Sequence, residues 1–180
     1  MQLKLAPWAL LAVAAMWGIS FVWMKDILDQ QDVYSFLTSR FIFAALAMII
    51  IKPKVLKLFT KELVSKGFII GLALGSGYIF QTLGLDRTTP AITGFITGLY
   101  VVITPLIAAL LLKERVTLTM WGFILLAVVG LAVLSVQGWS VGFGEFLVFL
   151  SAILFAVHII MLGAWSKNFD AYALTVMQLI

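Results

Sequence analysis

The sequence predicts an all-α, polytopic membrane protein. Of its 180 residues, 63% are hydrophobic and 11% are charged. A soluble domain of this length has too little interior to hide so much apolar surface, so lipid is the expected solvent. The apolar residues also form long runs separated by short charged loops, and each run can cross a hydrocarbon core of about 30 Å as a helix.

Six complete transmembrane helices and the start of a seventh are expected. The six apolar runs are Ala6–Met24, Val33–Ile51, Gly67–Leu85, Ala91–Leu112, Leu118–Val136 and Gly144–Trp165. A seventh run opens at Ala171 and continues to Ile180, the last residue of the sequence. The fourth run holds Pro105, which lacks an amide donor and frees the carbonyl of Val101, so we expect a kinked helix there.

The basic residues set the expected orientation. With the N-terminus in the cytoplasm, nine of the twelve lysines and arginines fall on the cytoplasmic side. Five of these nine lie in the loop between the second and third spans, from Lys52 to Lys66. Because cytoplasmic loops carry the excess of basic residues, the sequence predicts a cytoplasmic N-terminus in the cytoplasmic (inner or plasma) membrane.

Composition also narrows the possible functions. The chain has no cysteine, so thiol catalysis and cysteine–metal sites are excluded. It has one histidine and no HExxH, GxSxG or phosphate-loop motif, so neither an enzyme nor a cofactor or metal site is expected. The basic residues lie in short loops between spans, where they face anionic lipid rather than nucleic acid.

A constant shift of 138 residues along the sequence aligns the beginning of the chain with its end. Three identities anchor this repeat shift: Ala14 with Ala152, Asp32 with Asp170, and Tyr34 with Tyr172. Five spans separate the two starts, and an odd number inverts the second copy. We therefore expect a first five-span repeat over residues 1–137 and the start of an inverted repeat over residues 138–180. Such repeats are typical of secondary transporters with a solute site between the halves.

Four of the spans carry distinctive short motifs. They are Trp17-Gly18-Ile19-Ser20-Phe21 in the first, Arg40-Phe41 in the second, Ala91…Pro105…Leu112-Lys113-Glu114-Arg115 in the fourth, and Gly122 with Gly130-Leu131 in the fifth. Together they resemble the EamA-type transporters of the drug/metabolite transporter superfamily, most specifically from Thr88 to Leu134. The resemblance implies a ten-span fold of two inverted five-span repeats that moves small metabolites, often by export. About three and a half spans of that fold are missing from this sequence.

The fourth span holds a polar stripe. Thr93, Thr97, Tyr100 and Thr104 recur at i, i+4, i+7 and i+11, which places four hydroxyl groups on one face of a helix. Because such a face is unfavourable against lipid, it should point toward protein or water and line a substrate path. The alternative is that the threonines bond to their own helix.

Small residues and a proline accompany the stripe. Gly94 and Gly98 would let a neighbouring helix approach closely, and Pro105 would let the span bend. A kinked helix with a polar face is suited to a moving gate or a solute cavity. The alternative is that these residues only pack.

Further path candidates lie on other spans. Tyr78 and Gln81 in the third span could bind solute or only bridge helices. Trp17, near the centre of the first span, could wall a cavity or face lipid. His158 is the only histidine, and it could carry a proton or only pack.

Arg40 is the only basic residue within a span. A guanidinium there could bind a carboxylate or phosphate bidentately. It could also be a structural arginine that reaches the interface or pairs with a helix end. Acidic residues are absent from the middle of every complete span, so carboxylate-based ion coupling has no candidate in this chain.

These patterns predict a secondary transporter that exports a small organic metabolite, such as an amino acid, by alternating access. The expected partners are membrane lipid and this small-molecule solute, with a homodimer as a further possibility. Two other hypotheses stay open. One is a non-transporting membrane scaffold or an inactive, truncated half-transporter, and the other is a passive channel.

Overall fold

The computed structural model describes residues 2–112, 117–135 and 142–180, and every regular element in these ranges is helical. In chain order the elements are α1 (Gln2–Leu28), α2 (Val33–Ile51), the 3₁₀ helix η1 (Pro53–Leu58), α3 (Lys61–Arg87), α4 (Pro90–Gly98), α5 (Tyr100–Leu112), α6 (Leu118–Ser135), α7 (Phe143–Trp165) and α8 (Ala171–Leu179). The prediction of an all-α chain is confirmed.

Five stretches of the described residues are long and apolar enough to cross a membrane. They are Leu11–Leu28, Val33–Ile51, Lys61–Arg87, Pro90–Leu110 and Phe143–Trp165. The fifth expected span is present as α6, whose apolar stretch within the described residues is the shorter Leu118–Ala127. The expected count of six complete spans is therefore not confirmed.

The fourth span consists of two helices. α4 ends at Gly98, Leu99 forms a turn, and α5 begins at Tyr100. The expectation of one continuous helix over Ala91–Leu112 is wrong, because the turn at Leu99 divides it. Pro105 lies inside α5, and the expected kink at Pro105 stays a prediction. Gly98 weakens the end of α4, and Pro105 removes a hydrogen bond from the following turns, so the interruption falls between them.

α1 and α3 are longer than their apolar runs. α1 continues to Leu28, and α3 covers Lys61–Arg87 rather than Gly67–Leu85. At the start of α3, the hydroxyl of Thr60 accepts a hydrogen bond from the amide of Leu63 at 3.2 Å, which caps a turn that hydropathy does not detect. Lys113-Glu114-Arg115 and the expected repeat boundary at residues 137–138 lie outside the described residues.

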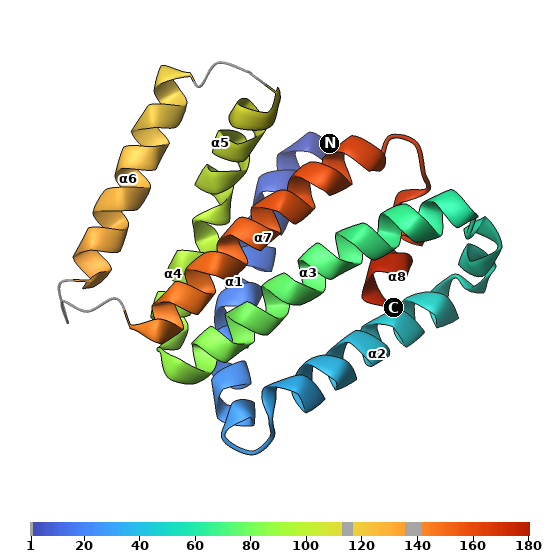
Figure 1. Ribbon diagram of the computed structural model, residues 1–180, viewed down its shortest axis with the longest axis horizontal. Helices are drawn as coiled ribbons and strands as arrows, with labels where there is room; N and C mark the ends of the chain where they lie inside the picture. The colour runs from blue at the N-terminus through green and yellow to red at the C-terminus, as the bar shows by residue number, and fades with distance from the viewer. Residues whose placement is uncertain (1, 113–116, 136–141) are drawn as a thin grey trace.

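α3 and α7 lie side by side through the middle of the molecule (Figure 1). A Cβ atom on Gly84 of α3 would lie 2.5 Å from Val148 Cγ2 and 2.7 Å from the carbonyl oxygen of Gly144, both in α7. Farther along, a Cβ on Gly77 would lie 2.7 Å from the ring of Phe155. Because helices in lipid associate through close packing, these glycines set the spacing of the pair.

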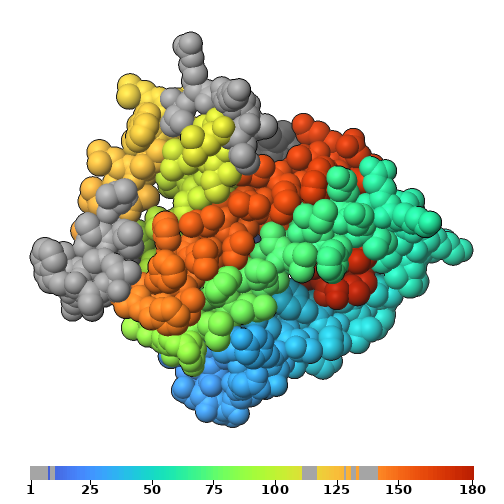
Figure 2. Space-filling model, viewed as in Figure 1, coloured from blue at the N-terminus to red at the C-terminus, as the bar shows by residue number. Residues whose placement is uncertain are grey.

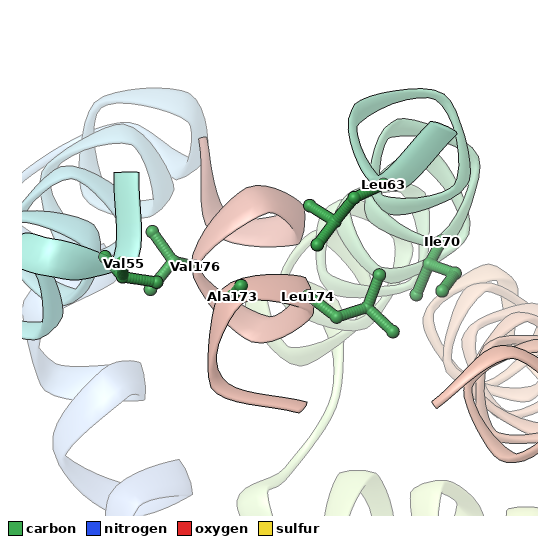
Figure 3. Close-up of a cluster of buried hydrophobic side chains, with 6 residues drawn as sticks. All are labelled: Val55, Leu63, Ile70, Ala173, Leu174 and Val176. Atoms are coloured by element: carbon green, nitrogen blue, oxygen red, sulfur yellow. The ribbon is translucent and has the colours of Figure 1, made fainter. Parts of the chain in front are cut away.

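α8 is held between η1 and α3. Figure 3 shows Val176 beside Val55 of η1 and Leu174 directed toward Leu63 and Ile70 of α3. These five side chains are buried. In the space-filling view, α8 is recessed between α2 and α3 (Figure 2), so it is anchored on two sides.

Two glycines of α3 permit this approach. A Cβ on Gly67 would lie 2.5 Å from Met177 Cγ, and one on Gly71 would lie 3.0 Å from the carbonyl oxygen of Gln178. Gly67, Gly71 and Gly75 are spaced by four residues and form one ridge along α3. A Cβ on Gly75 would meet no atom within 4 Å. The ridge therefore packs against α8 at only two of its three glycines.

α2 and α8 begin alike, at positions that correspond under the repeat shift. Asp32 Oδ1 accepts hydrogen bonds from the amides of Tyr34 at 2.9 Å and Ser35 at 3.1 Å. Asp170 Oδ1 accepts one from the amide of Ala173 at 2.8 Å. Both aspartates are N-caps, so two residues that align in the sequence have the same structural role.

The helix ends gather at two opposite ends of the molecule. At one end, Lys25 Nζ donates to the carbonyl oxygens of Leu85 at 2.9 Å and Asp86 at 2.6 Å, at the C-terminus of α3, where a cation is favoured. At the other end, Lys52 Nζ lies 3.6 Å from Asp170 Oδ2. This links the end of α2 to the start of α8.

The glycine contact between α3 and α7 predicts a site-specific loss of stability. Gly84→Ala should lower stability by about 1–3 kcal/mol, because the new methyl group meets the backbone of α7 and the two helices must separate. Gly75→Ala, in the same helix, should be neutral or slightly stabilising, because its methyl group meets no atom within 4 Å. Thermal unfolding of both variants in detergent measures the difference, and equal Tm values would contradict it.

The cap of α8 predicts an acid-sensitive contribution to stability. The hydrogen bond from the amide of Ala173, followed by the charge of Lys52, holds the pKa of the Asp170 carboxyl below its usual value of 3.8. A lowered folded-state pKa stabilises the protein above about pH 4, and this contribution is lost as the pH falls through that pKa. Asp170→Asn keeps a capping side chain, so its Tm should fall less than that of the wild type between about pH 6 and about pH 3. Identical losses would contradict this assignment.

Candidate functional site: a cavity between six helices

A cavity of about 210 Å³ lies between α1, α2, α3, α4, α5 and α7. Its volume equals that of about seven water molecules, so it accommodates a small solute. Seven of the nine candidate path residues line it: Trp17, Arg40, Tyr78, Gln81, Thr97, Tyr100 and His158. Residues from six helices, far apart in the sequence, thus meet at one place.

Thr93 and Thr104 lie outside the lining of this cavity. Thr93 is fully buried, and its hydroxyl has no hydrogen-bond partner within the part of the chain that the structure describes. The hydroxyl of Thr104 donates to the carbonyl oxygen of Tyr100 at 2.6 Å. The turn at Leu99 interrupts the expected four-residue stripe, and only the two members that flank it reach the cavity.

The three expected hinge or packing residues differ in their surroundings. A Cβ on Gly94 would lie 3.6 Å from the ring of Phe21, an ordinary contact. Gly98 has nothing within 4 Å, so it does not support a close helix approach. Gly98 and Pro105 instead line a second groove of about 390 Å³, between α6 and the α4–α5 pair.

Tyr78 is fixed by two aromatic neighbours. The ring centroids of Phe41 and Tyr78 are 5.3 Å apart with an interplanar angle of 76°, and those of Tyr78 and Phe155 are 5.2 Å apart with an angle of 73°. Both pairs have the edge-to-face geometry that aromatic rings favour. Arg40 Cζ lies 5.0 Å from the Tyr78 ring centroid, within reach of a cation–π interaction.

A buried hydrogen bond joins α3 to α4 at the cavity wall. Gln81 Nε2 donates to Thr97 Oγ1 at 3.0 Å. Gln81 is 4% exposed and Thr97 is 5% exposed. The bond therefore ties α3 to the last turn of α4, just before the break at Leu99.

A second polar contact joins α7 to α8. His158 Nε2 lies 2.7 Å from Gln178 Oε1. His158 lines the cavity, and Gln178 lines the adjacent groove between α2, α3 and α8. Every lining residue of the cavity is neutral apart from Arg40 and the titratable His158.

Six lining residues are missing from the sequence-based set of candidates. They are Ser20, Phe21, Met24, Leu74, Phe155 and Ile159. The repeat expected from the sequence relates part of this set to residues of another helix. Under the repeat shift, three lining positions of α1 fall on three lining positions of α7: Trp17 on Phe155, Ser20 on His158, and Phe21 on Ile159.

Comparison with known proteins identifies relatives of this chain. Residues 4–136 match the model of the EamA-like transporter family. An uncharacterized transporter from Archaeoglobus fulgidus is 38% identical over 164 residues, which are 90% of this chain and 50% of the relative. The chain thus spans about half the length of that curated relative. No solved structure matches the chain significantly.

The bond between Gln81 and Thr97 predicts energetic coupling. Thr97→Val removes the acceptor and leaves the buried amide of Gln81 unpaired, whereas Gln81→Leu combined with Thr97→Val removes both partners. A double-mutant cycle by chemical unfolding in detergent should give a coupling of about 0.6–1.7 kcal/mol, the usual size of hydrogen bonds between membrane helices. A coupling near zero would show that the two residues do not interact.

Proposed function

Because the chain belongs to the EamA-like transporter family, we propose that this multi-pass membrane protein provides the solute path of a secondary transporter for a small organic metabolite. The observation that carries the proposal is the cavity at which six helices converge. Gln81, Thr97, Tyr100 and His158 bring hydrogen-bonding groups to its walls. Polar groups inside a membrane are costly unless they face protein or a watery cavity, and here they mark the path.

The broken fourth span supports alternating access. Thr97 lies in the last turn of α4, before the break at Leu99, and Tyr100 is the first residue of α5, after it. Both residues line the cavity. Interrupted helices at a central solute site are typical of secondary transporters. A change at Leu99 would move α5 relative to α4 and change the shape of the cavity.

The inverted repeat is part of the proposal. The N-caps Asp32 and Asp170, which correspond under the repeat shift, support a first repeat over residues 1–137 and a second that begins in residues 138–180. The paired lining positions of α1 and α7 support a solute site between the halves. The cytoplasmic N-terminus, the cytoplasmic membrane and the direction of export follow from the distribution of basic residues and from the family, as part of the same proposal.

The packing glycines weigh against the scaffold hypothesis. A scaffold would use its glycine faces to bind partner proteins. Gly67, Gly71, Gly77 and Gly84 instead approach other helices of the same chain, which leaves those faces occupied.

Efflux assays test the path. Membrane vesicles that contain the full native protein should release at least one member of a panel of amino acids and small organic acids faster than empty vesicles. Tyr100→Ala should slow this release by about tenfold, the effect of losing roughly 1.4 kcal/mol of interaction. Tyr34→Ala is the matched control and should release solute at the wild-type rate. Tyr34 is 59% exposed at the start of α2 and does not line the cavity.

Normal insertion and normal efflux in Tyr100→Ala would remove Tyr100 from the path. Release of no solute in the panel by the wild-type protein would argue for the scaffold hypothesis.

A further inference from the structure

We propose that the cavity selects solutes that carry one oxyanion group, a carboxylate or a phosphate, and that Arg40 binds this group. The inference rests on the proposed function, because it names the class of solute for the same cavity. Among the lining residues, Arg40 carries the only fixed charge, and none is an aspartate or glutamate. A permanent cation therefore faces the cavity without an acidic side chain on its walls.

Arg40 has weak partners in the structure. Its Nη1 donates to Met24 Sδ at 3.5 Å, and its Cζ lies 5.0 Å from the Tyr78 ring centroid. A thioether sulfur is a poor acceptor, and a guanidinium has five N–H donors. The ring satisfies part of the charge but accepts none of these donors in a strong hydrogen bond. Arg40 thus retains donor capacity for a ligand at the cavity.

Two other basic residues show what a structural role looks like in this chain. Lys25 donates to two carbonyl oxygens at the end of α3, at 2.9 Å and 2.6 Å. Arg87 donates to the carbonyl oxygen of Leu83 at 2.8 Å, and its Nη1 lies 3.8 Å from Asp86 Oδ2. Both are bound at a helix end. Arg40 lies about 10 Å along α2 from its first residue, two turns into the helix, and it has no such acceptor among the described residues.

The geometry of Arg40 suits an oxyanion. A guanidinium is planar and offers paired donors that match the two oxygens of a carboxylate or phosphate. Arg40 Cζ lies 5.0 Å from the centroid of the Tyr78 ring, and Tyr78 is itself held between Phe41 and Phe155. A cation–π contact with a ring that is itself held in place restrains the guanidinium and reduces the entropy that is lost when a ligand binds.

The rest of the cavity indicates a solute with only one charged end. Under the repeat shift, Arg40 falls on Gln178, a neutral residue. Gln178 contacts His158, which lines the cavity from α7. Phe155 and Trp17 supply apolar wall. The residue that corresponds to Arg40 under the repeat shift is therefore an uncharged amide, which lines the adjacent groove and contacts the cavity wall through His158.

Binding of three probes of similar shape tests the proposal. Benzoate carries a carboxylate, phenyl phosphate carries a phosphate, and benzamide is the neutral analogue of benzoate. Each is measured by calorimetric titration of the purified full native chain in detergent. We expect benzoate or phenyl phosphate to bind at least about tenfold more tightly than benzamide, a difference of about 1.4 kcal/mol. The ratio between the two anions shows which oxyanion the cavity favours.

Variants assign the preference to Arg40. Arg40→Gln should abolish the difference in affinity between the favoured anion and benzamide, and Arg40→Lys should restore part of it because the charge returns without the paired donors. Arg87→Gln is the matched control and should keep the wild-type preference. If benzamide binds to the wild-type protein as tightly as both benzoate and phenyl phosphate do, the proposal is overturned without any variant. Failure of both anions to bind, or an unchanged preference in Arg40→Gln, would overturn it too.

Efflux of the same probes separates this inference from the proposed function. If vesicles with the wild-type protein release benzamide as fast as the two anions, the chain transports and the charge selectivity is wrong. If benzoate binds through Arg40 but vesicles release none of the probes, the anion site stands and the proposed transport of such solutes fails.

Discussion

The close contact between α3 and α7 is the constraint on which the rest of the structure depends. Gly84 and Gly144 let the two backbones meet, and Gly77 receives the ring of Phe155. This spacing places Tyr78 and Gln81 of α3 opposite Phe155 and His158 of α7. A bulkier residue at the crossing would separate these walls, so the cavity depends on glycine as much as on its polar lining. In lipid, where apolar side chains gain little by leaving the solvent, such steric fit is the main source of helix association.

Much of the fold and much of the cavity could be predicted from the sequence. Long apolar runs are strong signals, because an unpaired backbone in lipid must become helical. Polar residues inside those runs are equally informative, which is why seven of nine candidates meet in one cavity. Which glycines pack could not be predicted. Gly67, Gly71 and Gly75 share a helical ridge, but only the first two touch α8, because periodicity defines a face and not its neighbour.

The break at Leu99 and three of the four residues with which α1 lines the cavity could be recognised only in the structure. A proline is the usual cause of a helix kink, so an irregularity in the fourth span is expected at Pro105 rather than next to Gly98, where α4 ends. Ser20 carries a single hydroxyl, and Phe21 and Met24 are apolar, so nothing in their pattern indicates that the three residues share a cavity. Their importance becomes visible only when α7 presents the corresponding positions of the repeat to the same cavity. The proposed repeat thus relates lining positions of α1 to lining positions of α7, but only after one of the two helices has been located in space.

The most direct test of the account is whether the cavity is a water-accessible path. The chain has no cysteine, so a single one can be introduced without a background. Ser20→Cys places a thiol at the cavity, and Ser39→Cys places one on the exposed face of α2, which is expected to face lipid. The two serines are matched, because each native hydroxyl donates to a carbonyl oxygen of its own helix at 2.7 Å. Labelling membranes with a charged, membrane-impermeant thiol reagent should modify Ser20→Cys, leave Ser39→Cys unmodified, and block efflux only in the first. An unreactive Ser20→Cys, or one that is modified without loss of efflux, would contradict the account.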